Sequence, residues 1–268
     1  MNSIHILKRF GFHIAQEQNS IYPFSPVYKV ENKIVKRTQY PLERATNLVN
    51  YITYLREAGT AIVTPVKLQT SNPQQMEDDV YICYPYIEGT SYKGVDQEIK
   101  QAGELLGTIH SLSSKDNVFN LNKFDVFDFT YGEVDEHMKE IERYAGLYQI
   151  DADLQGLRKL LYQAVENQET LQKASLTWVE TPHDYKANNL VYTDSPTLID
   201  PDNAKWIPRT FDVALALLLF HNELSSAPNR VFSPQEWQLF LDGYVAHQTF
   251  TKTEKETWNE AVLHVFFR

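Results

Sequence analysis

Hydrophobic and polar positions divide the chain into two regions of different character. In the first third, residues 27–31 and 33–36 alternate apolar and polar side chains around a tight turn, which predicts a β-hairpin. Residues 41–58 carry apolar side chains at helical spacing and end at Gly59, which predicts a helix. Two further strands are expected, at residues 65–70 and 80–87.

From about residue 88 the helical period dominates. Amphipathic helices are expected over 96–112, 134–148 and 154–171, and further helices from residues 211, 233 and 251. Short strands are expected at 176–179, 190–193 and 197–200. The pattern therefore predicts an α+β protein, with a small β-rich N-terminal lobe (residues 1–87) joined to a larger helical C-terminal lobe (residues 88–268).

Composition narrows the class of protein. The 268 residues are 43% hydrophobic and carry a formal net charge of −10, which disfavours nucleic acid as a partner and favours a cationic small molecule. The lone cysteine, Cys83, suits a reducing compartment. The apolar run 213–220 is too short to cross a membrane, and the first residues lack a signal-peptide pattern. We therefore expect a cytoplasmic protein without a membrane partner.

The most informative residues are Asp184, Asn189 and Asp200. The first two lie five positions apart in His183-Asp184-Tyr185-Lys186-Ala187-Asn188-Asn189, and a short apolar hairpin leads to the third. Phosphoryl transfer from a nucleotide uses such a set: one Asp orients and deprotonates the hydroxyl, while an Asn and a second Asp bind the metal. We therefore predict Asp184 as the catalytic base and Asn189 and Asp200 as metal ligands. Each alone is also ordinary turn chemistry.

Lys36, at the end of the strand predicted over residues 33–36, is a candidate for binding nucleotide phosphates. Such a lysine needs a carboxylate to fix it, and the following helix offers Glu43 before Glu57. Glu43 lies in the first turn, where an acid also suits the helix dipole. Lys36 has the alternative of being a solvated residue at a strand end.

Several residues around the motif admit a structural or a functional role. Asp202 is either a ligand of a second metal or a loop acid, and Asp212 either caps a helix or braces the catalytic loop. His183 is either a base, an orienting group or a packed histidine, and Arg209 has the spacing to pair with a carboxylate. Aromatic residues near the carboxyl end are expected mostly in the core, with an acceptor pocket as the alternative: Trp206, Phe211, Trp237, Tyr244 and Trp258.

The order of these motifs resembles the aminoglycoside phosphotransferase and choline kinase family, small-molecule relatives of the protein kinases. The resemblance covers roughly residues 20–245. It rests on the Asp184–Asn189 loop together with Ile199-Asp200. Weaker likenesses are the Lys36 strand, Tyr84-Pro85-Tyr86-Ile87-Glu88-Gly89, Leu105-Leu106-Gly107-Thr108-Ile109-His110 and Phe240-Leu241-Asp242-Gly243-Tyr244.

The resemblance implies a two-lobed protein-kinase-like fold with ATP or GTP bound between the lobes and Mg²⁺ as cofactor. It implies that the backbone of Cys83, Tyr84 and Tyr86 meets the nucleotide base. It also implies that a loop around Ser25 approaches the phosphates.

Three departures from the family pattern stand out. His183 directly precedes Asp184, where the family has one residue between them, and Pro201 follows Asp200. Residues 19–27 contain no glycine, and two prolines there remove amide donors that would cradle phosphate.

The predicted function is transfer of the terminal nucleotide phosphate to a hydroxyl of a small, cationic molecule, such as an aminoglycoside-like antibiotic or choline. The alternative is a catalytically silent kinase-like binding protein.

Overall fold

The computed structural model describes residues 2–221 and 224–267. Its N-terminal part is built on an antiparallel sheet in the order β1-β2-β4-β3. The strands are β1 (Val27–Val30), β2 (Lys33–Thr38), β3 (Gln74–Met76) and β4 (Asp79–Pro85). The predicted hairpin is confirmed, and Glu31 takes a left-handed φ of 52° at its turn.

The strand predicted at residues 65–70 is wrong, and β3 lies instead in the polar stretch that follows. The reason is Asn72, whose side chain takes the place of a neighbouring strand. Its Oδ1 accepts from the Cys83 N–H at 2.9 Å, and its Nδ2 donates to the carbonyls of Cys83 and Val66 at 2.7 and 3.0 Å. A local side-chain bond of this kind satisfies backbone groups without a strand ladder.

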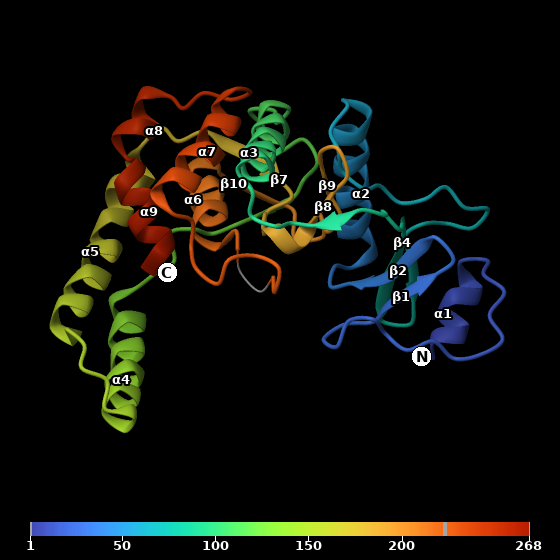
Figure 1. Ribbon diagram of the computed structural model, residues 1–268, viewed down its shortest axis with the longest axis horizontal. Helices are drawn as coiled ribbons and strands as arrows, with labels where there is room; N and C mark the ends of the chain where they lie inside the picture. The colour runs from blue at the N-terminus through green and yellow to red at the C-terminus, as the bar shows by residue number, and fades with distance from the viewer. Residues whose placement is uncertain (1, 222–223, 268) are drawn as a thin grey trace.

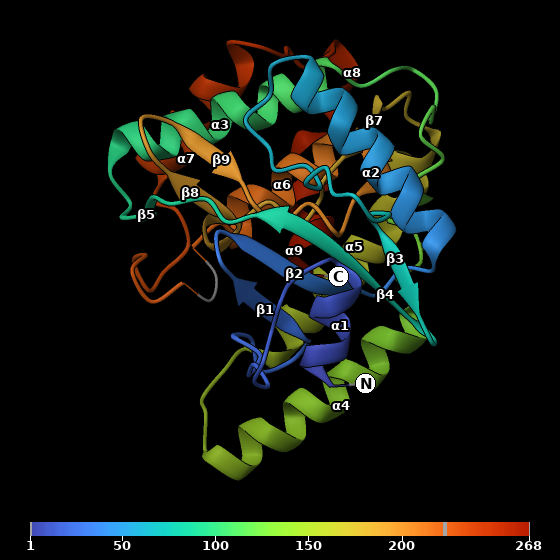
Figure 2. The same ribbon diagram turned by 90° about the vertical axis from the view of Figure 1, so that its right-hand side faces the viewer.

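The two faces of the sheet bury different helices because successive β side chains point to opposite faces. Tyr81 and Cys83 of β4 pack with Ile6 and Leu7 of α1 (Ser3–Arg9), a helix that the sequence pattern did not reveal. The alternate residues of β4 join the cluster of α2 (Leu42–Glu57), which confirms the helix predicted over 41–58. Figure 2 shows α2 as a diagonal helix above β4.

The C-terminal part is mostly helical, and its elements follow the predicted order (Figure 1). The helices are α3 (Asp96–Ser111), α4 (Tyr131–Tyr148), α5 (Leu154–Lys173), α6 (Arg209–Leu219), α7 (Pro234–Val245), α8 (Lys252–Glu256) and α9 (Trp258–Phe267). Two small sheets lie between them. One has the order β6-β10-β7 (Asn122–Lys123, Lys205–Pro208, Trp178–Thr181) and the other β5-β8-β9 (Thr90–Ser91, Leu190–Tyr192, Pro196–Leu198).

The hydrophobic core runs through both parts. One cluster joins α2 to α3, α6, α7 and the β8–β9 hairpin. The core therefore continues from the N-terminal sheet, which ends at Pro85, into the C-terminal part. Trp237 and Trp258 pack against this cluster and Tyr244 lies within it, as expected for core aromatics. Among the described residues, no helix combines the length and apolar character that a membrane span requires.

Helices α3 and α7 approach each other closely because glycines stand at their contact. A Cβ on Gly103 would overlap the carbonyl oxygen of Phe240, and one on Gly243 would overlap the carbonyl oxygen of Lys100. Only a residue without a side chain fits there. This contact sets His110 of α3 beside Tyr244 of α7, with 2.9 Å between His110 Nδ1 and the Tyr244 hydroxyl.

We expect Gly103→Ala to lower the free energy of unfolding by about 1–3 kcal/mol, the usual cost of overpacking, because backbone atoms have to move. The matched control is Gly146→Ala on α4, where a Cβ meets nothing within 4 Å. There the better helix propensity of alanine gives no loss, or a gain of up to about 1 kcal/mol. Urea unfolding of the two variants checks this, and equal stabilities would contradict the close-contact explanation.

Candidate active site

The loop that carries Asp184 connects β7 to a 3₁₀ turn, Ala187–Asn189, and then to β8. His183 and Asp184 both take left-handed φ angles, of 54° and 46°. Each costs about 1–2 kcal/mol in a non-glycine residue, so surrounding bonds must hold them. Asn189 supplies one, because its Nδ2 donates to the Asp184 carbonyl oxygen at 2.9 Å.

The Asp184 carboxylate faces a partly open region. Its Oδ2 accepts from Asn203 Nδ2 at 3.2 Å and lies 3.2 Å from the Lys186 ammonium, and the side chain is 37% exposed. Asn203 follows Asp200 by three positions, so this bond draws the two acid-bearing loops together. Sequence reasoning missed Asn203, whose only signal is its place shortly after Asp200.

The β8–β9 hairpin brings Asn189 and Asp200 to the same end. Leu190 pairs with Leu198, and the Ile199 N–H donates to the Asn189 carbonyl at 2.9 Å. Asn189 and Ile199 therefore stand opposite each other, and Asp200 comes next in the chain. The structure thus gathers the three predicted residues of the motif through Asn189, Asn203 and this hairpin.

Lys36 reaches this cluster from the N-terminal sheet. Its ammonium lies 2.7 Å from Asp200 Oδ1 and 3.1 Å from Asp202 Oδ2. Asp202 in turn accepts from the Tyr84 hydroxyl at 3.0 Å. The candidate partner on the following helix, Glu43, is exposed in the first turn of α2, where its helix-dipole role remains.

The charges of this group follow from its burial. Burial works against the Lys36 ammonium, but the Asp202 and Asp200 carboxylates outweigh it and raise the pKa of Lys36 above its ordinary value. Lys36 therefore stays charged. Burial raises the pKa of Asp202, with Asp200 adding to the rise and Lys36 opposing it. Asp202 is thus a buried partner of Lys36 and Tyr84 rather than a solvated loop acid.

Asp212 braces the catalytic loop. The buried carboxylate accepts from Thr181 Oγ1 at 2.9 Å and lies 3.1 Å from His110 Nε2 and 2.9 Å from His183 Nδ1. Burial alone raises its pKa, but the hydrogen bonds of His110 and His183 outweigh burial and hold the pKa of Asp212 well below its usual range. Pro208 occupies the N-cap of α6, so the bracing interpretation is right and the capping one is wrong. His183 is the packed histidine, and its ring contacts that of Phe124 in a tilted arrangement, with 4.9 Å between the ring centroids.

The residues expected to meet the nucleotide base lie on β4 and directly after it. The N–H of Cys83 donates to Asn72 and that of Tyr86 to Asn32, so both groups already have hydrogen-bond partners. The Tyr84 side chain binds Asp202. Because hydrogen-bonding groups alternate along an antiparallel strand, the Pro85 carbonyl points to the side of β4 away from β2, as the backbone groups of Cys83 do.

The segment before β1 is organised by Ser20 rather than by Ser25. Ser20 Oγ accepts from the N–H of Val27 at 3.0 Å and donates to the Tyr22 carbonyl at 2.6 Å. Ser25 contributes a carbonyl to the same hydroxyl, at 3.0 Å. The predicted pairing of Arg209 is confirmed, since its Nε donates to Glu254 Oε1 at 2.8 Å.

A divalent cation suits part of this donor set. Among residues 2–221 and 224–267, no group of three or more His, Cys, Asp or Glu side chains is arranged to bind a metal ion. Mg²⁺, however, needs few protein ligands, because it keeps waters and binds phosphate oxygens. The Asn189 bond to Asp184 uses the amide nitrogen and leaves the amide oxygen for a cation, and Asp200 is 41% exposed. These two residues fit such an ion.

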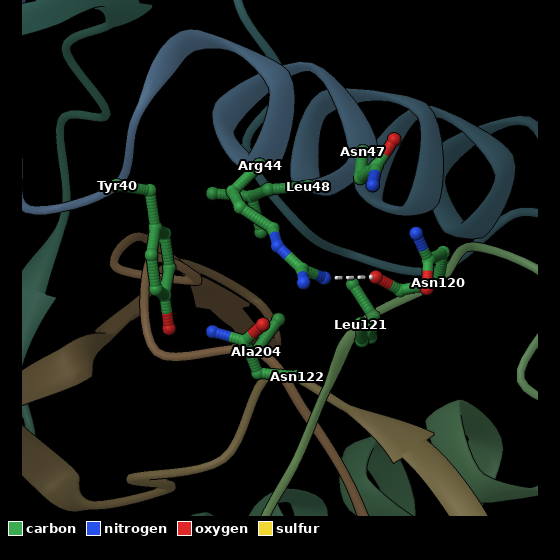
Figure 3. Close-up of a pocket in the computed structure, with 8 residues that line it drawn as sticks. All are labelled: Tyr40, Arg44, Asn47, Leu48, Asn120, Leu121, Asn122 and Ala204. Carbon is green, nitrogen blue, oxygen red and sulfur yellow. Dashed lines mark hydrogen bonds between the residues drawn. The ribbon is translucent and has the colours of Figure 1, made fainter.

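A small pocket lies beside the cluster, between α2 and the strands β6 and β10 (Figure 3). Arg44 of α2 points across it and donates to the Asn120 carbonyl at 2.9 Å. Nearby, Lys205 donates to the Tyr40 hydroxyl at 2.9 Å. With about 10 Å³ of space it holds no substrate, and its contacts tie α2 to the C-terminal part.

We expect Asp212→Asn to lower the free energy of unfolding by about 3 kcal/mol, because the amide NH₂ then faces buried donors. The native pKa is depressed, so the carboxylate's contribution is complete above its ordinary pKa of about 3.9 and is lost as pH falls toward the native value. The difference between parent and variant should be constant from neutral pH to about pH 5 and shrink below about pH 4.

Urea unfolding across this pH range measures the effect. Asp242→Asn is the matched control, since Asp242 is exposed on α7 and bonds only to Gln238 among the hydrogen bonds of the described residues. A similar loss in the control would contradict the bracing role.

Comparisons with known proteins agree with this geometry. Solved structures share the fold, although their low sequence identities say nothing further. An amicoumacin kinase, hAmiN, solved with AMP-PNP and Ca²⁺, is 14% identical over 98% of this chain and 83% of its own, with a TM-score of 0.68. Spectinomycin phosphotransferase APH(9)-Ia, solved with ADP and spectinomycin, is 18% identical over 97% and 84%, with a TM-score of 0.63.

A microcompartment-associated aminopropanol kinase is 13% identical over 91% of this chain and 80% of its own, with a TM-score of 0.61. The search of curated proteins finds no match. The predicted two-lobed kinase-like fold is thus confirmed. The sequence profile described as "Phosphotransferase enzyme family" (APH) matches residues 25–255, well over half of the sequence, and the chain therefore belongs to that family.

Proposed function

We propose that this protein transfers the terminal phosphate of ATP to a hydroxyl group of a small molecule. The observation that supports this most is the convergence of Lys36 from the sheet with Asp200 and Asn189 from the hairpin, beside the loop of Asp184. It joins a phosphate-binding cation, cation-binding oxygens and a partly open carboxylate in one place.

In the proposed reaction, the acceptor hydroxyl oxygen attacks the terminal phosphorus. An oxygen–phosphorus bond forms as the bond to the bridging oxygen of ADP breaks, and the hydroxyl proton passes to the Asp184 carboxylate. Asn203 and Lys186 fix the orientation of that carboxylate. Asn189 and Asp200 would hold Mg²⁺, which when bound neutralises phosphate charge.

Asp202 would keep Lys36 in place during this reaction. Asp200 cannot serve the ammonium and a metal ion equally well, whereas Asp202 is buried and fixed by Tyr84. We infer that Asp202 takes the place of a helix carboxylate, because Glu43 and Glu57 of α2 are both exposed. Lys36 then remains positioned for the phosphates when Asp200 binds the cation.

The backbone near β4 favours adenine. The N–H groups of Cys83 and Tyr86 are engaged, and residue 85 is a proline without an N–H. The Pro85 carbonyl, on the side of β4 away from β2, would accept a hydrogen bond from the exocyclic amine of adenine, whereas guanine has a carbonyl oxygen at that position. This supports ATP over GTP.

The segment before β1 favours the second candidate, a silent binding protein. Pro23 and Pro26 offer no amide to phosphate, and Ser20 is occupied by its own loop. Turnover measurements decide between the two.

We expect Asp184→Asn to lower kcat by about 10²–10⁴-fold while leaving ATP binding intact, because the general base is lost and the phosphate site is not. Asp200→Asn should instead abolish the Mg²⁺-dependent thermal stabilisation by ATP. ATP consumption with a panel of alcohols, together with thermal shifts, measures both.

The control for these two variants is Asp194→Asn, an exposed acid in the β8–β9 turn. It should behave as the parent protein does. Stability of the parent that does not respond to ATP and Mg²⁺, together with no ATP turnover, would sink the proposed phosphotransfer and favour the silent binding protein. Unchanged turnover in Asp184→Asn would instead refute Asp184 as the general base.

We expect Asp202→Asn to weaken the apparent Mg²⁺ affinity by about tenfold, equal to about 1.4 kcal/mol, because Lys36 then pairs with Asp200 alone and competes with the cation. Tyr84→Phe, which removes only the bond to Asp202, should move it in the same direction by less. The readout is a Mg²⁺ titration of the ATP thermal shift, and unchanged midpoints would refute the anchoring role of Asp202.

A further inference from the structure

A cavity of about 230 Å³ opens beside the catalytic loop, with His183 in its wall. Residues of α6 and α9, two helices that pack against each other, form much of its wall. The chain after β6 and residue His183 complete it. The lining residues are Phe124, Val126, His183, Ile207, Phe211, Leu215, Leu219, His264 and Val265.

The lining is apolar except for two histidines, and one of these is committed to the fold. His264 lies against backbone carbonyls, with Nε2 2.5 Å from the Val126 oxygen and Nδ1 3.4 Å from that of Ala164. His183 bonds Asp212 through Nδ1, so Nε2 is the ring nitrogen that remains for a ligand. A ligand group here therefore meets hydrocarbon walls and a single adaptable polar atom.

The cavity is poorly suited to a positively charged ligand group. Among the described residues that line it, none is a carboxylate. Asp212, behind His183, already binds Thr181, His110 and His183 through its oxygens. A cation moved from water against this described lining loses its hydration without a carboxylate in the wall to replace it, which is costly.

We propose that this cavity binds a neutral, apolar group of the phosphate acceptor, such as an aryl or branched alkyl moiety. The proposal rests on the proposed function, because it takes Asp184 as the base. His183 lines the cavity and is the neighbour of Asp184 in the chain. An acceptor with its apolar group in the cavity thus has its hydroxyl near the catalytic loop.

The volume suits one ring. A dry cavity of about 150 Å³ lined by Leu, Ile and Phe side chains binds benzene in another protein. At about 230 Å³ the present cavity has room for a benzene ring with a short substituent. Burying such a ring contributes most of the binding free energy, and His183 supplies the orientation.

The test uses two probes of equal shape and different charge, benzyl alcohol and benzylammonium, titrated calorimetrically into the full chain without nucleotide. We expect benzyl alcohol to bind at least about tenfold more tightly, because the ammonium pays for desolvation. Leu215→Trp, which fills the cavity, should weaken benzyl alcohol binding by about tenfold or more.

Leu218→Trp is the matched control, since residue 218 lies on the same helix, is also partly exposed and does not line the cavity. Its binding should match that of the parent. Leu219→Trp, at a position that is 45% exposed, provides a second filling variant if Leu215→Trp does not fold. Circular dichroism verifies the folding of each.

Turnover links the cavity to the acceptor. The kcat/KM for 2-phenylethanol should exceed that for 2-aminoethanol in the parent, and the ratio should fall toward one in Leu215→Trp. Tighter binding of benzylammonium, unchanged binding in both filling variants, or a reversed substrate preference would overturn the proposal. A failure of ATP turnover would refute the proposed function instead, and the nucleotide-free titrations would still decide what the cavity binds.

Discussion

A carboxylate removed from water requires compensating hydrogen bonds, and Asp212 obtains them from elements that are distant in the sequence. His110 comes from α3, Thr181 from the end of β7 and His183 from the catalytic loop. Because the donors converge on one buried side chain, the loop has little freedom to shift relative to these elements. The left-handed backbone of His183 and Asp184 is tolerable only within such a frame.

A second constraint joins the two parts of the molecule. Lys36, on the sheet, is held by Asp200 and Asp202 of the C-terminal part, and Tyr84 of β4 fixes Asp202. In a kinase-like fold the corresponding carboxylate is expected on the helix after the lysine strand, but the two carboxylates of α2, Glu43 and Glu57, are exposed. Here the carboxylate that holds Lys36 lies on the Asp200 loop instead. The position of the lysine side chain therefore depends on how that loop packs against the sheet.

The sequence predicted most long elements because their apolar spacing is strong, as in α2 and α3. The strand prediction failed at residues 65–70, because the Asn72 side chain there forms hydrogen bonds that a neighbouring strand would otherwise form. The spacing of Asp184 and Asn189 pointed to the loop, but not to Asn203 or to the pairing of Asp202, because those contacts depend on tertiary placement. Long-range side-chain partners leave no periodic signal.

Net charge and local chemistry point to different ligands. A formal charge of −10 favours cations at the surface as a whole, because long-range fields sum over all residues. Binding in a cavity instead depends on the atoms that replace water, and those around His183 are mostly hydrocarbon. An acceptor that satisfies both conditions keeps any positive charge outside the cavity and places an apolar group within it. The local desolvation cost therefore decides which end of such a molecule lies beside α6 and α9.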